Sequence, residues 1–115
     1  MASSIFAISQ RSRACCHWER TAAEARAAGN LGDRPLIVLT AGQVFVPDNP
    51  AQAQEASAFH DLWVHKLQPQ LAQLSTRGRQ VIVEKSGHGI QFEAPEAVIG
   101  AVHEVFTQIH GEQRK

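Results

Sequence analysis

The residue with the clearest chemical potential in this sequence is a histidine that lies between two glycines. The segment "KSGHGIQF" places His88 in a Gly-His-Gly turn, directly after a short apolar and β-branched run. Flanking glycines remove side-chain bulk beside the ring and permit backbone conformations with positive φ. An imidazole presented in this way can act as a general base near neutral pH. The alternative is a surface-turn histidine without a role.

Two apolar runs and a helix between them must position this histidine. "LIVLT" (36–40) and "VIVE" (81–84) show no apolar–polar alternation, which is typical of strands buried on both faces of a parallel sheet. Residues 51–74 predict a helix, in which Pro69 should introduce a kink or end the helix near Gln68. Its apolar stripe has three- and four-residue spacing and consists of Ala56, Phe59, Leu62, Trp63, Leu67, Leu71 and Leu74.

Helices are also expected at both ends of this unit. The alanine-rich stretch from His17 to Ala28 favours a helix that stops at Gly29. A last helix should begin at Pro95 and end at Gly111. Its apolar stripe is Val98, Ile99, Val102, Val105, Phe106 and Ile109. The expected fold class is therefore α/β, in the order helix–strand–helix–strand–helix.

The parallel arrangement decides where a site should form. Ligands bind at the carboxyl ends of strands in open α/β sheets. The loops "AGQVFVPDNP" (41–50) and "KSGHGIQF" (85–92) leave those ends, so His88 lies at the correct edge. A sheet of two strands also has two open edges, which invite pairing with another chain. The exposed sheet edges are therefore the expected surface for self-association.

The segment "SGHGIQFEAPEAVI", together with the strand before it, resembles the carboxyl-terminal portion of an α/β-hydrolase. In that family the last two core strands are followed by the loop with the catalytic histidine and by a closing helix. The resemblance covers about residues 31–110, and it identifies residues 17–115 as the C-terminal part of such a domain. It implies hydrolysis of an ester, amide or related bond in a small-molecule substrate by a Ser-His-acid mechanism. His88 would then take the proton of the serine and give it to the leaving group.

Two parts of the family's triad have no clear counterpart here. The nucleophile should lie on a G-x-S-x-G elbow, and no such pentapeptide occurs; the nearest serine, Ser86, is on no elbow. The acid often follows the first of the two strands in a G-x-x-D pattern, which from Gly42 reaches Phe45. Asp48 in the same loop is the remaining candidate acid. The alternative to a hydrolase is a catalytically inert fragment or an interaction module.

The remaining side chains carry weaker signals. His60 and His65 are five residues apart, a poor spacing for a shared metal on one helix face, and neither a metal nor a cofactor is expected. His103 and His110 fall on the polar side of the last helix. Trp63 is expected to pack in the core, with the lining of a substrate pocket as the alternative.

The composition excludes several classes of partner. Eleven basic and eleven acidic residues cancel, so nothing favours electrostatic capture of nucleic acid, and no apolar run approaches the ~20 residues of a membrane span. The two cysteines, Cys15 and Cys16, are adjacent, which indicates neither a disulfide framework nor a zinc site and fits the cytoplasm. The first sixteen residues, MASSIFAISQRSRACC, are expected to be an unstructured leader or a start that does not belong to the fold.

Overall fold

The computed structural model describes residues 19–113, which divide into two compact units. The first unit ends at Asn30 and contains a helix over residues 19–27. Arg20 and Glu24 form an ion pair of 3.2 Å along this helix, and Gly29, at φ +77°, follows its end as predicted. The expected leader over residues 1–16, with its two cysteines, lies outside the described residues.

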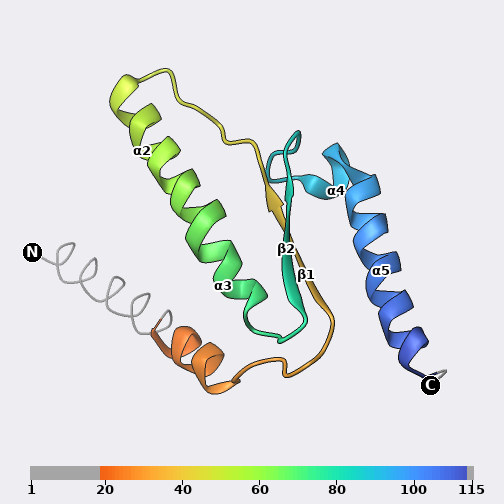
Figure 1. Ribbon diagram of the computed structural model, residues 1–115. Coiled ribbons are helices and arrows are strands. Elements are labelled where there is room, and N and C mark those ends of the chain that lie inside the picture. The colour runs from red at the N-terminus through yellow and green to blue at the C-terminus, as the bar shows by residue number, and fades with distance from the viewer. Residues whose placement is uncertain (1–18, 114–115) are drawn as a thin grey trace, which may run out of the picture. The chain divides into compact units, whose positions relative to one another are not determined.

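The second unit begins at Leu31 and contains a parallel two-stranded sheet between helices. Its elements are β1 (Leu36–Ala41), α2 (Pro50–Leu62), the π-helical segment η1 (Trp63–Leu67), α3 (Gln68–Ala72), β2 (Gly78–Val83), α4 (Ile90–Glu93) and α5 (Pro95–Gln113). The strands pair in register from Leu36↔Gly78 to Ala41↔Val83. Figure 1 shows the α2–α3 segment on one side of the strands and α5 on the other. The mixed α/β class and the helix–strand–helix–strand–helix order are confirmed.

Strand β2 begins earlier than predicted, at Gly78, and ends at Val83. The polar residues before "VIVE" join the strand because each finds a partner in a distant element. The guanidinium of Arg79 donates to the carboxylate of Glu104 on α5, with a distance of 3.0 Å from Nε to Oε1. This hydrogen bond and the nearby negative charge raise the pKa of Arg79.

Pro69 was expected either to kink the helix after β1 or to end it near Gln68, and the helix does not end there. It continues through the proline, and the residues just before it form η1. The N–H of Gln68 donates to the carbonyl of Trp63, five residues earlier, instead of to that of Val64. In this π register the next donor, to the Val64 carbonyl, would be the N–H of Pro69, which proline lacks.

A buried polar network supplies the missing donor. Nε2 of Gln80 on β2 donates to the Val64 carbonyl at 2.9 Å and to Oγ1 of Thr40 at 3.0 Å. Oγ1 of Thr40, on β1, in turn donates to Oε1 of Gln68 at 3.2 Å. Thr40 is 1% exposed, so these groups are hydrogen-bonded to one another away from water. The network joins both strands to the helix at the π turn.

The helix covers the sheet with a different face from the predicted apolar stripe. Its buried residues are Val64, Gln68 and Ala72, spaced four apart. Members of the predicted stripe are largely exposed, for example Phe59 at 57% and Leu71 at 45%, so the stripe is not the face that packs on the sheet. Within residues 31–113 the sheet beneath the helix has two strands, and these cover only the side of the helix that meets Thr40 and Gln80.

Helix α5 runs past the expected stop at Gly111 to Gln113, and the carboxylate of Glu112 receives a hydrogen bond from Arg77. Val98 and Val105 are half-buried, and they line an apolar groove with Ile37 and Leu39 of β1. The other four members of the predicted stripe, Ile99, Val102, Phe106 and Ile109, are exposed. Within residues 19–113, no helix combines the length and apolar character needed to cross a membrane.

Candidate active site at the carboxyl ends of the strands

The loops that leave β1 and β2 are joined at the carboxyl ends of the strands. The N–H of Gly42 donates to the carbonyl of Val83 at 3.0 Å, and the N–H of Gln43 donates to that of Ser86 at 2.9 Å. These two hydrogen bonds extend the parallel pairing beyond the strands. They fix the backbone just before His88 relative to the loop after β1.

The Gly-His-Gly turn is held by a carboxylate from α4. Oε2 of Glu93 accepts the N–H of Gly87 at 2.9 Å, and the N–H of Glu93 donates to the carbonyl of Gly89 at 3.0 Å. Neither glycine has positive φ, so that part of the prediction is wrong. Their role is space, because a Cβ on Gly87 would lie 3.2 Å from Oε1 of Glu93. The small size of both glycines lets the carboxylate support the turn.

Ser86 is not placed to serve as a nucleophile. Its side chain is fully buried, and its Oγ donates to the carbonyl of Gly87 at 3.0 Å. The hydroxyl is thus committed to the backbone of the turn instead of facing open space. The serine nearest to His88 in the sequence has a structural role in this arrangement.

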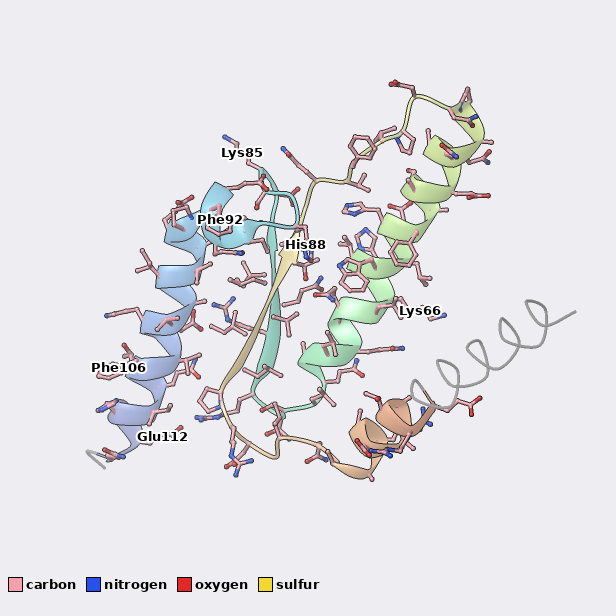
Figure 2. The ribbon with its side chains drawn as sticks, turned by 180° about the vertical axis from the view of Figure 1, so that it is seen from behind. Lys66, Lys85, His88, Phe92, Phe106 and Glu112 are labelled. Atoms are coloured by element: carbon pink, nitrogen blue, oxygen red, sulfur yellow. The ribbon has the colours of Figure 1, made fainter. Side chains whose placement is uncertain are left out.

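An open pocket of about 570 Å³ lies beside this turn. Its walls are mostly apolar and come from the end of β1, the following loop, helix α2 with the start of η1, and the His88 turn. The lining residues are Ala41, Gln43, Val44, Phe45, Phe59, His60, Trp63, Gly87 and His88. Figure 2 shows His88 where the strands end, on the side of α2, with Phe92 farther away on α4. An exposed imidazole thus borders an apolar hollow at the predicted edge of the sheet.

A second histidine borders the same pocket. His60 is half-buried on α2, and its Nε2 lies 3.2 Å from the carbonyl oxygen of Gly42, to which it donates in the corresponding tautomer. That hydrogen bond ties α2 to the end of β1 and leaves Nδ1 as an acceptor. The rings of Phe59 and Trp63 lie 6.0 Å apart beside it and form an aromatic wall. Trp63 therefore lines the pocket, the alternative to its expected place in the core.

The structure does not bring the candidate acid into this pocket. Asp48 is exposed in the bend before α2, and it is not among the pocket-lining residues. Its role as the triad acid stays a prediction. In the part of the chain that the structure describes, no three His, Cys, Asp or Glu side chains gather in a way that could hold a metal ion.

Sequence reasoning missed the roles of His60, Phe45 and Glu93. His60 and its neighbour Phe59 belong to the last turn of α2, so their place beside the site depends on how α2 returns past the end of β1, which the sequence pattern does not indicate. Glu93 lies within one helical turn of the Gly-His-Gly segment and could have been considered as its support.

Comparisons with protein-family models, with curated proteins and with solved structures yielded no match.

Proposed function

We propose that His88 is the general base of an α/β-hydrolase-type site that cleaves an ester, amide or related bond in a small molecule. The observation that carries this proposal is the pocket, in which the exposed imidazole of His88 lies beside apolar side chains at the carboxyl ends of parallel strands. Catalytic groups in open α/β folds gather at this edge. The described residues supply the base and an apolar binding surface, and the serine comes from outside them.

The chemistry assigned to these residues is limited and specific. His88 takes a proton from the attacking hydroxyl and returns it to the leaving group, so that no net charge accumulates on the ring over a cycle. Phe45, Phe59 and Trp63 bind the apolar part of the substrate. The second imidazole, His60, holds the loop after β1 in place through the Gly42 carbonyl. Asp48 remains the proposed acid, and it would have to approach from the bend before α2.

Ester hydrolysis by the purified chain tests the role of His88 without the missing serine. A base beside a bound ester can activate water, so p-nitrophenyl butyrate should be hydrolysed faster than by the same concentration of imidazole, and the rate should saturate with ester. His88→Ala should abolish the excess. His103→Ala is the matched control, because His103 is an exposed histidine of α5 outside the pocket. Equal rates for the native chain and His88→Ala would refute the proposal.

A second candidate function is a non-catalytic interaction module. Specific observations favour it, namely that the sheet of residues 31–113 has only two strands and that large apolar side chains of α3 and α5 are exposed. Such surfaces and strand edges are typical of sites that another polypeptide covers. This candidate predicts self-association, no ester hydrolysis above imidazole, and no labelling by a fluorophosphonate. A labelled, monodisperse monomer would contradict it.

A further inference from the structure

The edge of β1 opposite β2 can form backbone hydrogen bonds with a further strand. Within residues 31–113, β1 pairs only with β2, so the opposite edge of β1 has unpaired backbone groups. The N–H of Gly42 points to β2, because it donates to Val83. Since successive N–H groups of a strand point to opposite edges, those of Ile37, Leu39 and Ala41 point to the free edge.

Helix α5 presents an apolar flank on that same side. Glu104 marks the side over β2, because it pairs with Arg79. Val105 and Val98 lie about 100–120° around the helix from Glu104 and line the groove against β1. Val102 and Ile109 lie still farther around, at about 140–160°, and they are 65% and 42% exposed. The apolar flank therefore extends past β1, where the described sheet stops.

The helix on the opposite face of the sheet has the same asymmetry. His65, three residues before Gln68, lines a polar hollow with Glu84 just after β2. Leu71, three residues after Gln68, lies on the opposite flank of the helix and is 45% exposed. Polar side chains thus flank the β2 edge on both faces, and apolar side chains flank the β1 edge. A strand added to β1 would be covered on both faces, as strands inside a sheet are.

We propose that the β1 edge, with the flanks of α5 and α3, is the interface of a homodimer. A two-fold axis perpendicular to the sheet pairs β1 with β1 of a second copy in antiparallel orientation. The same operation places the two α5 helices side by side on one face and the two α3 helices on the other. One self-complementary contact thus pairs the strand edge and covers both apolar flanks. In the purified chain, a second copy is the polypeptide available to occupy this edge.

The size of the surface sets the expected strength. Val102, Phe106, Ile109, Leu71 and Leu74 are between 39% and 65% exposed. Together they leave roughly 150–300 Å² of apolar side-chain surface per copy, taking ~60–120 Å² for a fully exposed apolar side chain. A standard interface buries roughly 800 Å² per partner, somewhat more than half of it apolar. The dimer should therefore be weak, with dissociation constants of micromolar or above.

The inference does not rest on the hydrolase proposal, and it gives the interaction-module candidate a specific surface. The dimer contact involves the middle of β1, whereas His88 lies at the carboxyl ends of the strands. His88→Ala should leave the dimer unchanged, and a variant that abolishes the dimer should leave His88-dependent ester hydrolysis in place. Failure of one proposal is thus distinguishable from failure of the other.

The test combines molar mass with amide hydrogen exchange on the full chain. Sedimentation equilibrium should show a monomer that converts to a dimer as concentration rises. Exchange at the Leu39 N–H should slow in parallel, by up to about tenfold over a hundredfold rise in concentration, because the monomer fraction falls as the square root of concentration. Val102→Lys should abolish both effects. Thr107→Lys is the matched control, because Thr107 is exposed on the same helix and lies about 60° around the helix on the other side of Glu104, away from the β1 edge.

Three outcomes would overturn the proposal. One is a chain that stays monomeric with fast exchange at Leu39. Another is a monomer in which Leu39 is protected at every concentration, which would mean that another part of the same chain occupies the edge. The third is a dimer that survives Val102→Lys and leaves Leu39 unprotected, which would place the contact elsewhere. Circular dichroism checks that both lysine variants are folded, so that loss of the dimer reflects the surface.

Discussion

Replacing Gln80 by leucine tests the idea that a side chain substitutes for the N–H that Pro69 lacks. Gln80 is the donor to both the Val64 carbonyl and Thr40 Oγ1. Leucine has similar volume and keeps the β-strand position, but it cannot donate. The variant therefore removes hydrogen bonding from the centre of the unit while largely preserving its packing.

The cost follows from which groups are left without partners. The Val64 carbonyl loses its donor in a residue that is only 4% exposed, and an unpaired buried carbonyl costs about 1–3 kcal/mol. Thr40 keeps its hydrogen bond to Gln68 and loses only the bond that it accepts. The burial of leucine instead of an amide offsets part of the loss. We expect the free energy of unfolding to fall by about 2 kcal/mol.

Urea unfolding followed by far-UV circular dichroism, at one fixed protein concentration, measures this difference. Gln70→Leu is the matched control, because Gln70 lies on the exposed side of the same helix and should change stability by less than about 0.5 kcal/mol.

A double variant makes the reasoning sharper. Pro69→Ala restores the backbone N–H, so Val64 has a second possible donor, and Gln80→Leu should then cost at least about 1 kcal/mol less. If the effects of the two substitutions simply add, the link between the proline and Gln80 is refuted.

Three further predictions concern stability and the site. Gly78→Ala should destabilise the chain by about 3 kcal/mol in thermal unfolding, because a Cβ would lie 1.7 Å from the carbonyl oxygen of Ala72. Gly100→Ala should instead stabilise it by about 0.5–1 kcal/mol, because a Cβ there has nothing within 4 Å. Equal effects of the two substitutions would contradict this prediction. Glu104→Gln should lower the melting temperature only at low ionic strength, because it removes the exposed ion pair with Arg79. Since the pKa of Arg79 is raised, the stability that this pair contributes is fully present below the unfolded-state pKa of arginine and is lost only at strongly alkaline pH. A loss that does not depend on salt, or a step in stability near neutral pH, would contradict this prediction. Gly87→Ala should reduce His88-dependent ester hydrolysis about tenfold through displacement of the turn from Glu93, whereas an unchanged rate would show that the position of the turn is unimportant.

The elements that sequence predicted well are those whose signals are local. The run 36–40 is apolar and β-branched, and strand β1 covers it and one residue more. The last helix begins at Pro95 as expected, because a first-turn proline needs no N–H. The place of His88 at the carboxyl edge followed from the order of strands and helices alone.

The elements that sequence missed depend on partners far along the chain. Arg79 and Gln80 look like turn residues until Glu104 and Thr40 are brought beside them. The role of His60 depends on the return of α2 past the end of β1, where the Gly42 carbonyl accepts its hydrogen bond. The apolar stripe was predicted from regular α-helical spacing, whereas the π turn shifts the phase between its two halves, and its burial depends on how many strands lie beneath it.

The π turn in η1 also has a consequence for how insertions and deletions would act on this protein. A π turn contains one residue more than the α-helical turn it replaces, so it sets the rotational phase between the two ends of the helix. Removal of one residue from Trp63–Leu67 would restore a regular helix and rotate α2 by about 100° relative to α3. Gln68 and Ala72 would keep their packing on the sheet, while Phe59 and His60 would turn out of the pocket. A single extra residue thus sets the rotation of α2, which faces His88, relative to α3, which packs on the sheet.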